Sequence, residues 1–362
     1  MRFVLAVVVL QVCLAPSAVR ADESETPSRP PPPAPGPPAQ DFREPKAIIT
    51  FQIENDFFSR WAKSDRDYTN GVRIGWLSAP TTMPQWLADI TTVPTIFGEP
   101  RADSIVRRWG VSLGQNLYTP QDTSTRALIP NDRPYAGWLY IGFALQYTSV
   151  VGDRPVRLDT LQLDLGVVGP AAGGRFVQNN IHTLIGADKA RGWRNQIHNE
   201  PTVNFTFERR WRVGRLPDMA LPLGLEWDVI PTAGIAVGNV ATYASLGGIL
   251  RIGNDLRNDF GPPRARPAMP GSETFTTRDD FGWYFFVGVD GQAHAQNIFL
   301  DGNTFRSSHH VDRYPFVLDV QAGIVLLFRN ARVSLTHVLR SPEFSERDRW
   351  QQFGSISVAF RY

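Results

Sequence analysis

Residues 46–362 consist of short stretches in which apolar and polar residues alternate, separated by Gly, Pro, Asn and Asp. In residues 161–167 every second residue is aliphatic, and the residues between are Gln, Asp and Gly. A period of two places successive side chains on opposite faces of a β-strand. The pattern therefore predicts strands with one apolar and one polar face.

We expect about twelve of these strands, near residues 47–57, 68–78, 106–118, 137–150, 157–168, 202–212, 222–234, 241–253, 281–294, 314–328, 331–340 and 350–362. An even number of antiparallel strands is typical of bacterial outer-membrane barrels. The last stretch ends on the aromatic Tyr362, as final strands of such barrels do. These features predict an all-β fold, a transmembrane antiparallel β-barrel of about twelve strands.

The alternative is a soluble β-sandwich or barrel. Its outer faces, rich in Trp, Tyr and Phe, would expose large apolar patches to water, whereas lipid requires such faces. A closed barrel also pairs every backbone group without leaving a sheet edge in the bilayer. The membrane barrel is therefore favoured.

One stretch, residues 174–186, does not show the alternation of a strand. Five of its apolar residues recur at helical spacing: Phe176, Val177, Ile181, Leu184 and Ile185. Gln178 and His182 are four residues apart, so on a helix they share a face away from the centre of the apolar stripe. We predict a short loop helix between two strands, with no core contact for His182.

The first residues indicate export. Met1-Arg2, an apolar run to Val12 and small residues near Ala21 are typical of a secretory signal peptide. We expect a signal peptide at 1–21, a Pro-rich periplasmic tether at 22–45 and the barrel at 46–362. Cys13 lies in the signal and is the chain's single cysteine, so the mature protein would contain no disulfide.

Charge excludes one class of partner. The formal charge of +2 falls to zero if Arg2 and Arg20 leave with the signal, so nothing favours a nucleic-acid partner. Lysine occurs three times and all other basic residues are arginine. This bias reflects either genome composition or a use of arginine for phosphate binding.

Small polar residues gather in two segments, 54–58 and 67–71, where predicted strands meet loops. Asn55, Asp56 and Thr69 carry oxygen atoms of the kind that bind a hard cation such as Ca²⁺. The alternative is that Asn55-Asp56 and Asn70-Gly71 are ordinary turn residues. The two segments alone do not decide between these interpretations.

His182 also has two interpretations, a general base or a hydrogen-bonded structural residue. The sequence contains no G-x-S-x-G and no H-E-x-x-H motif. The common serine-hydrolase and zinc-protease mechanisms therefore lack support.

Several motifs occur in an order that resembles the outer-membrane lipid A 3′-O-deacylase family. They are residues 54–58 (ENDFF), 68–71 (YTNG), 118–120 (YTP), 132–137 (DRPYAG), 166–170 (GVVGP), 182–186 (HTLIG) and 192–196 (GWRNQ). The similarity extends over about residues 46–362 and is densest before residue 200.

The resemblance implies a twelve-stranded barrel with an active site on the outer-leaflet side. It also implies Ca²⁺-dependent hydrolysis of the 3′-linked acyloxyacyl ester of lipid A. On the matching positions, Asn55, Asp56 and Thr69 fall in the metal and oxyanion region. His182 falls on the general base and Gln178 on a nearby polar residue.

The expected protein is a lipid A deacylase in the outer membrane of a Gram-negative cell. Its partners would be lipid A or lipopolysaccharide as substrate, outer-membrane lipid and the barrel assembly machinery. Gln121, which follows the Tyr-Thr-Pro motif, leaves the phosphate-binding residue of the family unmatched. Two alternatives remain, a passive pore or structural barrel and an outer-membrane phospholipase with a serine nucleophile.

Overall fold

The computed structural model describes residues 46–55, 67–80, 82–90, 102–152, 154–213, 225–257, 259–262, 274, 275, 277 and 280–362. The predicted signal peptide and tether lie outside these residues. The chain divides into two units, and the described residues all belong to the second, Gln40–Tyr362.

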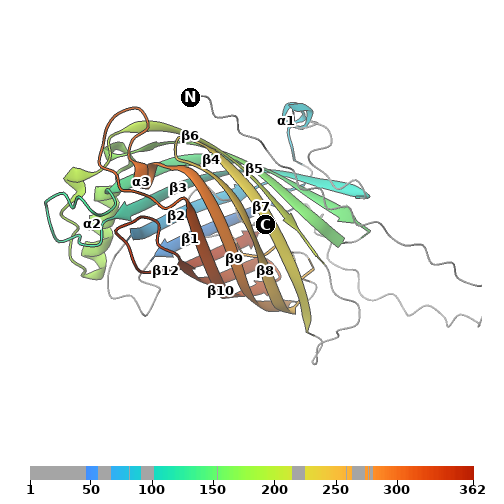
Figure 1. Cartoon of the computed structure of the whole chain (residues 1–362). Coiled ribbons are helices and arrows are strands. Elements are labelled where there is room, and N and C mark those ends of the chain that lie inside the picture. The colour runs from blue at the N-terminus through green and yellow to red at the C-terminus, as the bar shows by residue number, and fades with distance from the viewer. Residues whose placement is uncertain are drawn as a thin grey trace, which may run out of the picture. The chain divides into compact units, whose positions relative to one another are not determined.

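The described residues form a closed antiparallel barrel of twelve strands, in which each strand pairs with the next and β12 pairs with β1 (Figure 1). The strands are β1 Ile48–Asn55, β2 Asp67–Leu77, β3 Ser104–Thr119, β4 Ala136–Val151, β5 Arg154–Val168, β6 Glu200–Trp211, β7 Glu226–Gly238, β8 Ala241–Asn254, β9 Phe281–Asn297, β10 Phe316–Phe328, β11 Ala331–Arg340 and β12 Gln351–Arg361. The strand count and fold class predicted from the alternation are confirmed, with strand ends shifted by a few residues.

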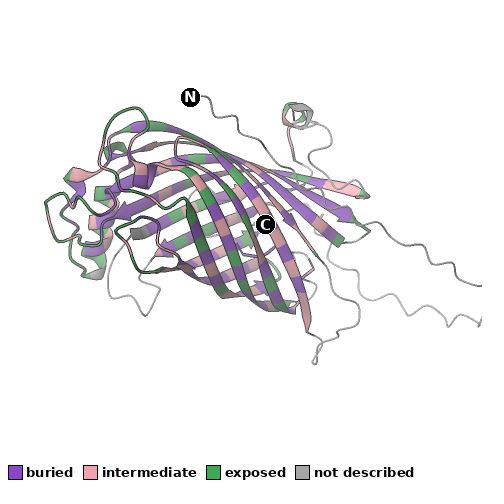
Figure 2. Cartoon of the chain, in the orientation of Figure 1, coloured by how far each residue is buried: buried purple, intermediate pink, exposed green. Residues whose placement is uncertain are grey.

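The alternation becomes an inner and an outer face. Along β1, Thr50, Gln52 and Glu54 are buried while Phe51 and Ile53 are exposed, and the striped burial of the strands is visible in Figure 2. The buried set lines the lumen and the exposed set forms the outer wall, as a barrel in lipid requires.

Three α-helices lie outside the strands in the described residues: α1 Gln85–Ile90, α2 Gly174–Ile185 and α3 Ile298–Asp301. Two 3₁₀ turns flank α2, η2 Pro170–Ala172 and η3 Trp193–Asn195. The predicted loop helix is therefore confirmed. None of the helices in the described part of the chain is long and apolar enough to cross a membrane.

The barrel has two different ends. At one end, here called the α2 end, lie α2, α3 and the loops around them (Figure 1). At the other, here called the terminal end, β1 begins and β12 finishes, with Ile48 opposite Arg361. Because consecutive strands run in opposite directions, successive loops lie alternately at these two ends.

Side chains fill the lumen at the α2 end. Phe299 of α3 stacks on Tyr118 of β3 with ring centroids 4.0 Å apart, and Trp138 stacks on Tyr140 at the same distance. A cavity of about 30 Å³ remains beside Tyr118 and His294. Such a cavity is large enough to hold a water molecule.

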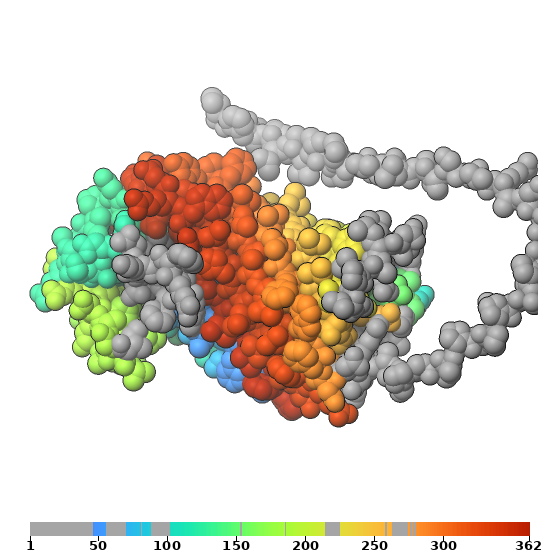
Figure 3. Space-filling view, turned by 90° about the horizontal axis from the view of Figure 1, so that it is seen from below, coloured from blue at the N-terminus to red at the C-terminus, as the bar shows by residue number. Residues whose placement is uncertain are grey.

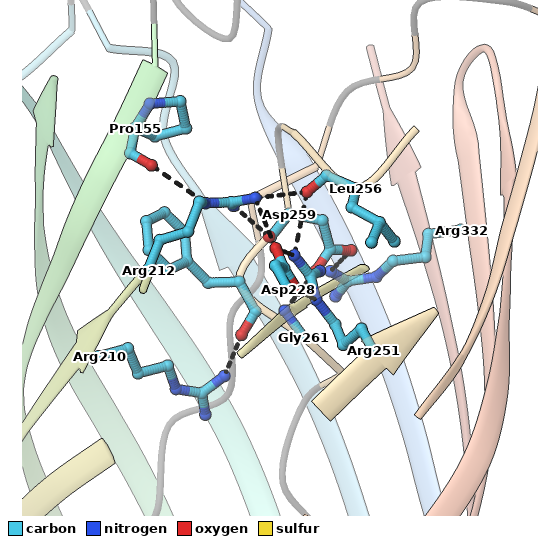
Figure 4. Close-up of polar contacts among 10 residues, drawn as sticks. Pro155, Arg210, Arg212, Asp228, Arg251, Leu256, Asp259, Gly261 and Arg332 are labelled. Carbon is cyan, nitrogen blue, oxygen red and sulfur yellow. Dashed lines mark hydrogen bonds and ion pairs between the residues drawn. The ribbon is translucent and has the colours of Figure 1, made fainter. Parts of the chain in front are cut away.

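A network of charged groups fills the lumen at the terminal end (Figure 4). Asp259, fully buried, lies 3.4 Å from Nη1 of Arg251 and 3.3 Å from Nη1 of Arg332. Arg251 also binds Asp228, which in turn accepts a hydrogen bond from Nη1 of Arg212 at 3.0 Å. Because buried charges are costly when one partner is lost, these contacts hold Asp259 inside the barrel end.

Candidate active site on the outer wall

Helix α2 packs on the outside of the barrel against β3 and β4. Leu117 of β3 has the same parity as the exposed Leu113, so it belongs to the outer wall, yet it is buried. It packs in a cluster with Tyr135, Ala190 and Trp193, against which Val177 of α2 also packs. Figure 3 shows the segment around α2, in yellow-green, beside the β3–β4 loop, in teal, at one end of the barrel.

Two glycines permit this close packing. A Cβ atom on Gly137 of β4 would lie 3.3 Å from Cβ of Ala172 and 3.4 Å from the Gly174 backbone. A Cβ atom on Gly174 would lie 2.5 Å from the Trp193 ring. These glycines, one in residues 132–137 and one in residues 174–186, therefore allow the first turn of α2 to lie directly on the barrel wall.

Gln178 connects α2 to the segment that follows it. The side chain is 2% exposed, and its Oε1 accepts a hydrogen bond of 2.7 Å from Nε1 of Trp193. Because Trp193 packs against Leu117, this bond links the polar face of α2 to the outer wall. The resemblance placed Gln178 near the base, and Trp193 is a partner that its sequence spacing did not predict.

His182 lies one turn further along the same face of α2. The side chain is 5% exposed, and its Nδ1 contacts the backbone oxygen of Asp188. The prediction that His182 has no core contact is therefore wrong, because residues 187–193 fold back over the helix. A carbonyl partner requires the proton on Nδ1, so Nε2 is the nitrogen able to accept one.

Asn55 lies two strands away from β3 on the same face of the barrel. Asn55 pairs with Asn70 across β1 and β2, and Asn70 pairs with Leu117 across β2 and β3. The three positions form one outer row, and Leu117 at the end of this row packs against the α2 segment. Asn70 is 9% exposed although it stands on the outer face.

The structure leaves the other metal candidates open. Asp56 lies outside the described residues. Thr69 belongs to β2 at a register shift between Tyr68 and Asn70. Among the described residues, no group of three or more His, Cys, Asp or Glu side chains could hold a metal ion.

The donor chemistry nevertheless fits a hard cation. Asn55 and Asn70 present amide oxygens on neighbouring strands, and Asp56 follows Asn55 directly. Ca²⁺ takes carboxylate and amide oxygens in a flexible coordination shell, whereas a transition metal would favour nitrogen or sulfur ligands. The residue types at this corner therefore suit Ca²⁺.

The 132–137 motif joins two loops at the α2 end through Arg133. Nη2 of Arg133 lies 2.8 Å from Oε2 of Glu343, and both side chains are buried. Burial raises the pKa of Glu343, while Arg133 and Arg340 lower it more, to about 2. The pair ties the β3–β4 loop to the β11–β12 loop, and Glu343 carried no sequence signal that could have identified it.

Gln121, the position that left phosphate recognition unmatched, lies in the same loop as Arg133. Its backbone N–H donates to Oδ2 of Asp132 at 2.6 Å. Its backbone thus helps to fold the loop.

Two comparisons with known proteins name the same family. Residues 9–362 match the family described as "Outer membrane protein LpxR". Among solved structures, "LpxR from Salmonella typhimurium" superposes with a TM-score of 0.67 and 20% identity, covering 86% of this chain and 99% of that chain. The β domain of the Bordetella autotransporter BrkA reaches a TM-score of 0.37 and 12% identity, with coverage of 88% and 97%. No curated protein matches the chain.

At 20% identity, the likeness to the Salmonella structure concerns the fold, the twelve-stranded closed barrel. The family match covers the barrel from its first strand to its last. It agrees with the resemblance drawn from the ordered motifs. This chain therefore belongs to the LpxR family of outer-membrane proteins, and its location is the outer membrane.

Proposed function

We propose that this protein is a lipid A 3′-O-deacylase, an ester hydrolase acting on lipopolysaccharide in the outer membrane. The observation that carries the proposal is the buried polar face of α2, where Gln178 and His182 lie on the outer wall. A site on the outside of a barrel lies on the side of a substrate in the membrane. A site for a soluble ligand would be expected in the lumen instead.

His182 is the proposed general base. With the Nδ1 proton directed to the Asp188 oxygen, Nε2 takes a proton from a water molecule. The water oxygen attacks the ester carbonyl, the bond between the acyl carbon and the 3′ oxygen breaks, and the Nε2 proton passes to the leaving sugar oxygen. The products are a fatty acid and a 3′ hydroxyl, and no covalent enzyme intermediate is needed.

Asn55, Asp56 and Thr69 are the proposed ligands of Ca²⁺. When bound, Ca²⁺ would polarise the ester carbonyl and stabilise the negative charge that develops on its oxygen. Asn55 belongs to the same outer row as Leu117, so it lies on the face of the wall from which the lipid arrives. Gln178, bonded to Trp193, acts as a positioning residue for α2.

Mass spectrometry of lipid A from a Gram-negative host tests the reaction. Expression of the wild type should remove the 3′-linked acyloxyacyl group, and Asp56→Ala should not. A chelator should abolish hydrolysis by the purified protein and added Ca²⁺ should restore it. Unchanged lipid A in the presence of folded wild type, or full activity in excess chelator, would contradict the reaction or its metal dependence respectively.

The two alternatives predict different measurements. A pore would conduct ions in planar bilayers, although side chains fill both ends of the lumen in the described residues. A serine phospholipase would be labelled by a fluorophosphonate. We expect neither conductance nor labelling.

A further inference from the structure

The outer wall of β3 to β6 contains one row of side chains that includes charged residues. In this row Arg107 pairs with Tyr147, Tyr147 with Asp159, and Asp159 with Arg209. The next outer row toward the α2 end is apolar: Trp109, Leu145, Leu161 and Phe207. The charged row therefore marks the lower boundary of the apolar belt, the depth at which lipid headgroups lie.

Positive charge predominates at this boundary. The fully buried Asp159 lies 2.6 Å from Nε of Arg209 and 3.3 Å from Nε of Arg157. Arg209 remains 21% exposed. Arg107 is exposed and forms no ion pair with any described residue. These residues therefore contribute three guanidinium groups and one carboxylate.

The charge is confined to one sector of the wall. On β7, β8 and β9, the same register row continues through Ala233, Leu246 and Gly291, which carry no charge. An aromatic and aliphatic boundary is the usual arrangement for an outer-membrane barrel. The arginine sector is therefore a local feature of this part of the wall. The aromatic and aliphatic residues usual at such a boundary do not explain it.

The sector faces the periplasmic leaflet. Outer-membrane barrels place their longer loops outside the cell, and here α2 and α3 lie in loops of the opposite end (Figure 1). Arginine binds phosphate through two parallel hydrogen bonds and keeps its charge at the edge of a bilayer. We propose that Arg107 and Arg209 bind the phosphates of anionic phospholipids in the periplasmic leaflet, independently of the deacylase site.

Native mass spectrometry of the full chain tests this proposal. The protein is released from micelles that contain equal amounts of phosphatidylglycerol and phosphatidylcholine, and the retained lipids are counted. The variant Arg107→Gln removes one guanidinium without breaking a described ion pair, and Arg107→Gln/Arg209→Gln removes two. Arg329→Gln, an exposed arginine in the β10–β11 turn at the same end, is the matched control.

We expect the wild type and the control to retain phosphatidylglycerol preferentially, and the double variant to lose about tenfold in that preference. The single variant should fall between them. Anomalous migration on unheated gels shows that each variant is folded. An equal preference in the double variant, no preference in the wild type, or complete displacement of the lipid by an equal concentration of inorganic phosphate would overturn the proposal.

Discussion

Replacing His182 by Asn or by Gln separates its two roles. In the structure, Nδ1 contacts the Asp188 oxygen, and Nε2 is the proposed acceptor of the water proton. The Asn amide nitrogen is bonded to Cγ, as Nδ1 of histidine is, so Asn can keep the bond to Asp188. The Gln amide lies one bond further out and cannot occupy the same position.

The two variants should differ in the stability of α2 and agree in activity. His182→Gln leaves a buried carbonyl without its donor, which costs about 1–3 kcal/mol, whereas His182→Asn should cost about 1 kcal/mol or less. Both remove the base, so both should lower the rate by roughly 10²-fold or more, equivalent to about 2.7 kcal/mol in the activation barrier.

Hydrogen exchange of the α2 amides measures the stability difference locally, because the barrel itself should be unaffected. Release of acyl chains from purified lipid A, followed by mass spectrometry, measures the rate. If folded His182→Asn deacylates lipid A at the wild-type rate, His182 is not the base. If the α2 amides are equally protected from exchange in both variants, the contact with Asp188 does not stabilise the helix.

Three further perturbations test the surrounding structure. Gly137→Val should drive α2 off the wall, because even a Cβ would lie 3.3 Å from Ala172, and should abolish activity while the unheated gel still shows a folded barrel. Since the pKa of Glu343 is lowered to about 2 from its usual 4.5, its ion pairing stabilises the fold above pH 4.5 and is lost as the pH falls toward 2. The thermal stability of Glu343→Gln should therefore change less over that range than that of the wild type. Deletion of residues 24–40 should leave folding and lipid A hydrolysis intact, and loss of assembly would show that this segment is more than a tether.

The alternation predicted the barrel because strand geometry is a local property. In residues 161–167 or 203–207, each side chain's face follows from its neighbours along the chain, so strand number and polarity needed no tertiary information. Helix α2 was predicted for the same reason, from apolar residues at helical spacing. The ordered motifs indicated the family, which the match over residues 9–362 confirms.

The candidate site depends on distances that the sequence does not encode locally. Trp193 reaches Gln178 and residue 188 reaches His182 because the segment after α2 folds back, and that path is set by packing against Leu117 on a strand far away in the sequence. The ion pair of Arg133 likewise joins loops 210 residues apart.

The sequence by itself determined the membrane barrel, its twelve strands and the loop helix, since each follows from short-range periodicity. The tertiary structure decided that the polar face of α2 is buried on the outer wall and that charged side chains fill the lumen at the terminal end. It also aligned Arg107 with Arg209 across four strands. Register and loop packing bring together residues that are distant in the chain, and no local pattern specifies them.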